Sequence, residues 1–405
     1  MKNIKTKDIV KKYDISKPTL NQWIDANKIS EPKRDWRGWR IWNESLIEEI
    51  EDLINDKKKN SKNRKVKIEK FSLNNRRYLG SKFKLLDFIN KIVKDNCEDI
   101  RSVADIFGGT GVVADLFYQQ GQKIIVNDLL LSNVLAYNTF FSKEKIDNKK
   151  LEELINEFNS KKVTEDNYFS LNFGNTFFTL DNSRKIGYIR ERIEELKDEL
   201  NERERAILIT SLIFAADKVA NTCGHYDAFR ETLDTTQEVK LLMPDIKKSE
   251  SKCEIFREDA NELVKHIEAD LVYIDTPYNS RQYGDLYHLL ENLAEWKKPI
   301  VTGKAKKMVD RSNIKSKYCT VKAPQAFDEL IGNINSRYIL VSYNNMAQKG
   351  VGRSNAKISN EEIIETLLKR GKVEIFNVDY NTYNAGKTDI KDHQELLYLC
   401  TVEGR

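Results

Sequence analysis

An apolar run at residues 103–107 passes directly into Gly108-Gly109-Thr110-Gly111, and this junction is the strongest constraint on the fold. An extended run that ends in glycines and continues as a helix, here from about Val112, is typical of an open α/β sheet. Glycines are needed at such a turn where a bulky ligand lies against the backbone. The junction therefore predicts a ligand-binding strand–turn–helix unit, a feature that many nucleotide-binding proteins share.

Further apolar runs alternate with helical stretches from Asn74 onward. We predict additional strands at residues 123–127, 271–274, 338–343, 373–378 and 395–399. This alternation predicts a parallel or mixed sheet flanked by helices. Residues from about 140 to 253 interrupt it and include a strongly charged segment, 190–205, that we expect to be one helix. We interpret this interruption as an inserted, mostly helical substrate module.

An acidic residue follows the second predicted strand. Asp128 comes about twenty residues after the glycines, where a carboxylate can accept both ribose hydroxyls of an adenosyl group. Alternatively, Asp128 caps the helix that follows. The segment Gly386-Lys387-Thr388 resembles the end of a P-loop, but Asn381 stands where that motif needs its first glycine. The pattern thus favours an adenosyl cofactor on a doubly wound sheet over a nucleoside triphosphate.

The run Asp275-Thr276-Pro277-Tyr278 directly follows the apolar strand at 271–274. Ligands bind beyond the carboxyl ends of such strands. Such a site suits methylation of an aromatic amine. The lone pair of the amine nitrogen is delocalised into the ring, and two acceptors that bind the amine hydrogens let this lone pair attack a methyl group. Asp275 supplies one acceptor, the main-chain carbonyl of residue 276 supplies the other, and Tyr278 can stack on a flipped base. The alternative is an ordinary proline-containing turn.

Residues 1–56 have the pattern of a small helical module. A helix at 4–13, a second helix, a basic hairpin at 33–42 with Gly38 at its turn, and a third helix capped by Asn43 follow one another. This order resembles winged helix-turn-helix domains of the MerR and excisionase type, whose second helix enters the major groove. Arg37 and Arg40 beside tryptophans suit phosphate contact. The alternative is a packing domain with its tryptophans in the core.

The order of the motifs from residue 74 onward resembles that of Dam-like adenine-specific DNA methyltransferases, whose hallmark is a D-P-P-Y tetrapeptide. A Y-x-G-x-K segment at 78–82 comes first, then D-x-F-x-G-x-G at 105–111, Asn-Asp at 127–128, an insertion, and the tetrapeptide at 275–278. The resemblance implies a Rossmann-like AdoMet-dependent methyltransferase sheet of the α/β class, with S-adenosylmethionine (AdoMet) as methyl donor.

The resemblance also implies a role for each matching residue. The cofactor-binding residues would be Tyr78, Lys82, Asp105, Phe107, Gly109, Gly111, Asp128, Asp259 and Asp275. The catalytic residues would be Asp275, Thr276, Pro277 and Tyr278. Thr276 departs from the hallmark because it replaces the first proline. The group needed there is a main-chain carbonyl, and Pro277 still favours an extended residue 276, so we expect an active enzyme that is slower at most.

These observations predict four segments: a DNA-binding winged helix-turn-helix at 1–56, a basic linker at 57–72, a catalytic domain at 73–140 and 252–405, and an inserted target-recognition region at 141–251. The predicted function is site-specific methylation of the exocyclic amine of adenine in double-stranded DNA, by base flipping, within a restriction-modification system. Its cognate restriction endonuclease would be encoded separately. The alternatives are an RNA adenine methyltransferase and a DNA-binding regulator with a degenerate methyltransferase core.

Composition excludes several other classes. The 405 residues include 68 Lys and Arg against 63 Asp and Glu, a balance that says little about partners. Five scattered cysteines without CxxC spacing predict reduced thiols and neither a disulfide framework nor a metal site. No apolar stretch reaches membrane-spanning length, and the N-terminus lacks the apolar region of a signal peptide. We therefore expect a cytoplasmic protein with no metal and no membrane partner.

Overall fold

The computed structural model describes residues 6–13, 15, 17–25, 28–63, 69–233, 236–344, 356–379 and 394–404. The chain divides into two compact units, Met1–Glu69 and Lys70–Arg405. Among the helices of the described residues, none is both long and apolar enough to cross a membrane.

The N-terminal unit contains the helices α1 (Thr6–Tyr13), α2 (Lys17–Asp25) and α3 (Glu44–Asn63). Between α2 and α3 an antiparallel bridge joins Arg34 to Arg40, and Gly38 turns the chain with φ of +80°. The Asn43 side chain accepts a hydrogen bond from the backbone N–H of Leu46 at 3.0 Å, which confirms the predicted cap. The element order is the expected one, although its identity as a winged helix-turn-helix stays a prediction.

The four tryptophans of this unit fall into two groups. Trp23 and Trp42 lie in its core, whereas Trp36 and Trp39 are 88% and 58% exposed. The guanidinium of Arg37 lies 4.8 and 5.5 Å from the ring centroids of the two exposed tryptophans. The alternative that the tryptophans are core residues thus holds for Trp23 and Trp42 but not for Trp36 and Trp39. Helix α3 continues into the segment expected to be a linker, of which residues 64–68 lie outside the described part.

Within the described residues, seven strands form the central sheet of the second unit, in the order β10-β11-β9-β6-β2-β3-β5. Their bounds are β2 (Ser102–Asp105), β3 (Lys123–Asn127), β5 (Cys253–Phe256), β6 (Leu271–Ile274), β9 (Tyr338–Asn344), β10 (Gly371–Asp379) and β11 (Gln394–Val402). Strand β11 pairs antiparallel with both neighbours, and the other pairings are parallel. The chain order reverses between β2 and β6, which is where doubly wound sheets bind ligands.

All six predicted strands are present, and the central sheet differs from the prediction in two respects. Strand β2 ends at Asp105 rather than at 107, because the chain there turns into a loop in which the N–H of Gly108 bonds the carbonyl of Asn127. Strand β5 was not predicted, since it is a short, half-buried edge strand with a glutamate in it. The mostly parallel sheet between helices confirms the predicted Rossmann-like α/β class.

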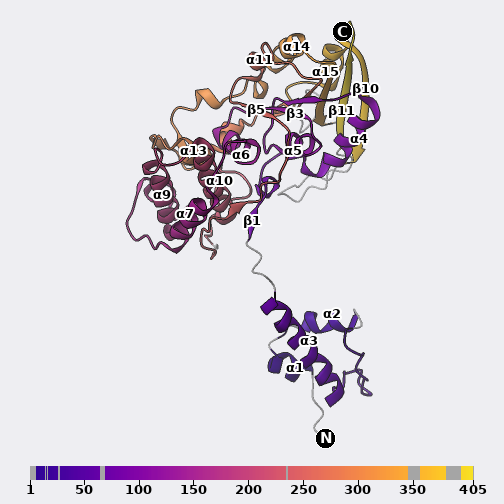
Figure 1. The fold of residues 1–405 in the computed structure, drawn as a ribbon, viewed down its shortest axis with the longest axis vertical. Coiled ribbons are helices and arrows are strands. Elements are labelled where there is room, and N and C mark those ends of the chain that lie inside the picture. The colour runs from indigo at the N-terminus through magenta and orange to yellow at the C-terminus, as the bar shows by residue number, and fades with distance from the viewer. Residues whose placement is uncertain are drawn as a thin grey trace. The chain divides into compact units, whose positions relative to one another are not determined.

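Helices cover both faces of the sheet, because side chains alternate between the faces along each strand. Val103 and Leu271 contribute to the core under α4 (Leu86–Asn96), α5 (Val112–Gln119) and α6 (Leu131–Phe141). Ala104 and Val272 contribute to the core under α11 (Ala260–Leu263), α14 (Ala323–Asn333) and α15 (Asn360–Leu368). Figure 1 shows these two helical layers on either side of the strands.

The insertion is helical, as predicted, and contains α7 (Asn148–Ser160), α8 (Tyr168–Phe173), α9 (Leu180–Glu195) and α10 (Glu202–Val219). The single helix expected at 190–205 is wrong. Asn201 and Glu204 form a capping box that starts a new helix, so the chain breaks between α9 and α10. The insertion shares one hydrophobic core with the sheet, and its helices gather at the end of the unit away from β10 and β11 (Figure 1).

Candidate active site

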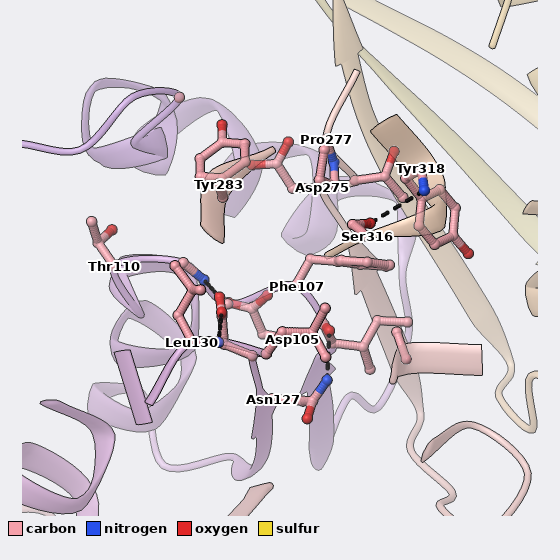
Figure 2. A pocket seen from close by; sticks show the side chains of 18 of the residues that line it. Asp105, Phe107, Thr110, Asn127, Leu130, Asp275, Pro277, Tyr283, Ser316 and Tyr318 are labelled. Carbon is pink, nitrogen blue, oxygen red and sulfur yellow. Dashed lines mark hydrogen bonds between the residues drawn. The ribbon is translucent and has the colours of Figure 1, made fainter. Parts of the chain in front are cut away.

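One cavity lies at the carboxyl ends of β2, β3 and β6. Asp105 is the last residue of β2, Asp128 directly follows β3, and Asp275 directly follows β6. Every predicted site residue lines this cavity except Gly111. The fold therefore assembles side chains from position 78 to position 278 in one place, with Tyr283 on one side and Ser316 and Tyr318 on the other (Figure 2).

Asp128 holds the glycine-rich turn from the side of β3. One carboxylate oxygen accepts a hydrogen bond from the N–H of Gly109 at 2.9 Å, and the other accepts one from the N–H of Leu130 at 2.8 Å. Burial raises the pKa of Asp128, and these bonds oppose the shift. The carboxylate thus fixes local backbone and also faces the cavity, but it is not the helix cap of the alternative, since α6 begins at Leu131 with Leu130 at its N-cap position.

The glycines of this turn are required by the protein's own packing. A Cβ at Gly108 would lie 2.6 Å from the hydroxyl oxygen of Tyr137, and one at Gly111 would lie 2.8 Å from its ring. Gly109 and Gly111 also have positive φ, +53° and +79°. Of the three, Gly108 and Gly109 line the cavity. Ligand approach is therefore not the main reason for glycine at 111.

A pair of stacked tyrosines fixes the segment at residues 78–82 over the cavity. The rings of Tyr78 and Tyr287 lie 4.6 Å apart at an angle of 8°. The hydroxyl of Tyr287 accepts a hydrogen bond from the N–H of Leu79 at 2.8 Å. The hydroxyl of Tyr283 donates a hydrogen bond to the carbonyl of Leu79 at 3.1 Å. Tyr283, in α12 (Tyr283–Leu286), and Tyr287, just before α13 (His288–Glu295), had no motif that could mark them from sequence.

Asp105 is buried in the centre of the cavity, only 1% exposed. One of its carboxyl oxygens has no hydrogen-bond partner within the described part of the chain. Burial, together with the nearby charge of Asp275, raises the pKa of Asp105 to about 8. A buried acceptor without a partner is costly, so this oxygen is suited to a donor or cation on a ligand.

Asp275 is held by a lysine that also contacts a second carboxylate. The ammonium nitrogen of Lys82 lies 2.9 Å from Oδ1 of Asp275 and 3.2 Å from Oε1 of Glu395. Burial raises the pKa of Asp275 to about 6, although Lys82 lowers it. Burial opposes the charge of Lys82, but the two carboxylates outweigh burial and hold its pKa well above the usual range. Sequence reasoning missed Glu395, which lies in no motif.

The residues after Asp275 are fixed by neighbouring loops. Thr276 is buried, and the carbonyl of Tyr278 accepts hydrogen bonds from the N–H of Lys357 at 3.0 Å and the hydroxyl of Tyr343 at 3.4 Å. The Tyr278 and Tyr343 rings meet edge to face, 6.0 Å apart. These contacts fix the backbone of the tetrapeptide while Tyr278 still lines the cavity.

Part of the cavity lining is aromatic. The rings of Phe107 and Tyr318 lie 5.2 Å apart at 84°, and Asp259 lies beside them in the lining. The hydroxyl of Tyr318 donates to Asn261 at 2.8 Å, and the carboxylate of Asp259 accepts from the N–H of the same residue at 3.0 Å. Two fixed rings next to a polar group suit a flat heterocycle such as adenine.

The acidic and basic residues that line the cavity are Lys82, Asp105, Asp128, Glu258, Asp259 and Asp275. The single cation among these described residues is already paired with Asp275. Such a lining repels the phosphates of a nucleoside triphosphate and attracts a cationic ligand. Across the described residues, there is no group of three or more His, Cys, Asp or Glu side chains that could hold a metal ion.

Residues 78–351 match the family model of the D12 class N6 adenine-specific DNA methyltransferases. Modification methylase StsI of Streptococcus sanguinis is 36% identical to the chain, over 80% of this chain and 51% of that protein. Type II methyltransferase M.FokI of Planomicrobium okeanokoites is 31% identical, over 80% of this chain and 52% of that protein. Type II methyltransferase M.NlaIII of Neisseria lactamica is 31% identical, over 78% of this chain and 95% of that protein.

The chain spans about half the length of the first two of these relatives and nearly all of the third. The family match covers the glycine-rich turn, Asp128, the insertion and the tetrapeptide at 275–278. It therefore confirms the resemblance drawn from the order of the motifs: the chain belongs to the D12 class N6 adenine-specific DNA methyltransferase family.

Proposed function

We propose that the protein transfers a methyl group from AdoMet to the exocyclic amine of adenine in duplex DNA. The observation that supports this most is the placement of Asp275, at the carboxyl end of β6, in one acidic cavity with Asp105 and Asp128. A hydrogen-bond acceptor for an amine and a lining suited to a cationic cofactor then share one site. Family membership supports the same reaction.

The residues present fit AdoMet. When bound, it supplies an electrophilic methyl group on a sulfonium cation, and the surplus of acids in the lining complements that charge. The unpartnered oxygen of Asp105 would accept from the ammonium group of the methionine part. Asp128 would accept from the ribose hydroxyls, and Phe107 would contact the adenine ring. The role of Asp128 is the one expected from the sequence, whereas the roles given to Asp105 and Phe107 are more specific than the place in the cofactor pocket expected for them.

The target amine would be bound by Asp275 and by the carbonyl of residue 276. Lys82 contacts Oδ1 of Asp275, which leaves the second oxygen available to accept an amine hydrogen. Tyr278 would stack on the flipped base, a contact worth about 1–3 kcal/mol in single-strand recognition. Alkylation makes the nitrogen cationic, so it must then release a proton, and Asp275 is the base within reach. Asp275 must be ionised for both tasks.

The relatives are named modification methylases and type II methyltransferases. We propose the same role here, with the inserted region at 141–251 choosing the sequence and a separately encoded restriction endonuclease as the partner enzyme.

The test is incubation of the protein with isotopically labelled AdoMet and either duplex DNA or RNA. We expect labelled N6-methyladenine in DNA at one short sequence, and no label in a duplex whose adenines at that sequence are replaced. Label in RNA alone would identify the RNA adenine methyltransferase alternative instead. Absence of label from both substrates would support the degenerate regulator.

For the N-terminal unit we propose a contribution to DNA affinity. Its exposed Trp36, Arg37 and Trp39 form a basic, aromatic hairpin turn that suits contact with the DNA backbone. Replacing all three by alanine in the full chain should weaken DNA binding and reduce the slope of log affinity against log salt by about 1. The methylated sequence should not change. Unaltered affinity and slope would refute the proposed contact, and an altered sequence would mean that this unit reads bases.

A further inference from the structure

Three ionisable side chains from distant parts of the chain meet beside the tetrapeptide. Lys82 begins the short 3-10 helix η2 (Lys82–Leu85), Asp275 follows β6, and Glu395 lies near the start of β11. The exposed fractions of these side chains are 7%, 20% and 10%. Because the ammonium group of Lys82 lies between the two carboxylates, it is shared by them rather than bound to Asp275 alone.

Glu395 is itself fixed in place. Its Oε1 atom, which contacts Lys82, also accepts a hydrogen bond from the hydroxyl of Ser342 at 2.7 Å. Ser342 is fully buried in β9, and β9 pairs with β11 in register, with Leu397 opposite Ser342. The Glu395 carboxylate is therefore anchored to the sheet, and Lys82 extends from this anchor to Asp275.

We propose that Glu395 is a positioning residue for methyl transfer: through Lys82 it holds the Asp275 carboxylate in place and keeps it a strong hydrogen-bond acceptor. This inference rests on the proposed function. An ammonium group bound to Asp275 alone would neutralise much of its charge and weaken its bond to the target amine. A second carboxylate on the same ammonium group weakens the bond between Lys82 and Asp275, so Asp275 keeps more of its negative charge for the target amine.

The charges around Asp275 agree with this role. The negative charge of Glu395 raises the pKa of Asp275, in the direction opposite to Lys82. Other ionisable groups that face this site are Asp105, whose pKa is raised to about 8, and Tyr273 and Tyr283, whose pKa values are raised well above the ordinary value. The two tyrosines are thus neutral at the pH of an ordinary assay. Glu395 and Lys82 supply the opposing charges on Asp275.

A purely structural role is the competing explanation, since a buried lysine needs a counter-charge whatever the chemistry. The two explanations predict different results. A structural partner affects the free energy of unfolding. A positioning residue also changes the turnover number and its dependence on pH.

The test is Glu395→Gln in the full chain, because an amide oxygen can still accept from Ser342 and Lys82 while the negative charge is lost. We expect the turnover number to fall about 10-fold, with AdoMet affinity within about twofold of the unaltered protein. The acidic limb of the turnover–pH profile should move to lower pH by about half a unit. Lys82→Gln should move the same limb to higher pH. Glu374→Gln is the matched control, since the Glu374 side chain on the neighbouring β10 is only partly buried and pairs with Lys372.

An unshifted profile and full turnover in Glu395→Gln would overturn the proposal, even with lower stability. Failure of the proposed function is recognised separately, because the unaltered protein would then methylate no DNA. In that case the carboxyl ¹³C resonance of Asp275 is titrated in both proteins. A lower pKa of Asp275 in Glu395→Gln supports the link between the residues, and an equal pKa overturns it.

Discussion

The two walls of the cavity hold their carboxylates by different means. On the wall formed after β3, Asp128 is bound by the backbone N–H groups of Gly109 and Leu130. On the wall formed after β6, Asp275 is bound by the side chain of Lys82, which Glu395 shares. Backbone donors come with the shape of a loop, whereas a shared ammonium group depends on particular side chains and on pH. The first wall is suited to binding a ligand and the second to tuning reactivity.

Replacing the carboxylate on each wall should separate these two tasks. Asp275→Ala should lower the turnover number by at least about 100-fold, because it removes an acceptor that acts on the reacting nitrogen. Asp128→Ala should instead raise the dissociation constant for AdoMet by about 10- to 100-fold, because it removes charged hydrogen bonds to the ribose. Steady-state kinetics with saturating AdoMet and calorimetric titration of AdoMet measure the two effects.

The two walls have different tasks only if the loss of Asp275 acts mainly on turnover and the loss of Asp128 mainly on AdoMet affinity. Thermal unfolding of both variants provides the control, because the loss of Asp128 also frees two backbone donors and is expected to lower stability. A variant of Asp275 with normal turnover would remove its assigned role. A variant of Asp128 that binds AdoMet normally and turns over slowly would show that both walls serve the chemistry.

Asp105 lies between the walls and should give a smaller effect, on stability. Its pKa is raised from 3.8 to about 8 in the folded protein, mainly by burial. Between these two pKa values the folded state holds a proton that the unfolded state has released. The contribution of Asp105 therefore lowers the free energy of unfolding as the pH rises from about 4 to about 8. Asp105→Asn has no such cost. Without cofactor, it should raise the melting temperature by a few degrees at pH 8 and by less at about pH 5.

Differential scanning calorimetry at both pH values checks this prediction. A gain that is equal at the two values would mean that the Asp105 carboxyl group has an ordinary pKa in the folded protein. The same variant should bind AdoMet more weakly, since an amide is a poorer acceptor for an ammonium group than a carboxylate.

The parts of the site that the sequence predicted are those set by local chemistry. A strand that runs into glycines, an acid directly after the next strand and a tetrapeptide after a buried strand can each be recognised within a few residues. The topology of the sheet then brings their ends together. The fold class was predictable for the same reason, because strand and helix alternate along the chain.

The parts that were missed depend on contacts between distant segments. Glu395 is an acid in an apolar strand, and nothing within that strand shows that it will meet Lys82. Tyr287 stacks on Tyr78 only because α13 packs against the segment after η1 (Leu73–Asn75). The break between α9 and α10 was in reach of sequence reasoning, since Asn201 and Glu204 are a capping-box pair. Strand β5 could not be predicted, because its four residues include a glutamate and show no clear apolar pattern.

The position of β11 in the sheet has a consequence for how the proposed active site is completed during folding. Strand β11 follows β10 in the chain but lies between β10 and β9, so it must enter the sheet at an interior position. Residues 338–344 of β9 and 395–401 of β11 pair although they are far apart in the chain, so this contact is non-local and has a loop-closure cost. A molecule without β11 in place lacks the Glu395 carboxylate and leaves an edge of β9 unpaired. Correct closure of the sheet and completion of the Lys82 contacts are thus one event, so incompletely folded molecules would be poor catalysts.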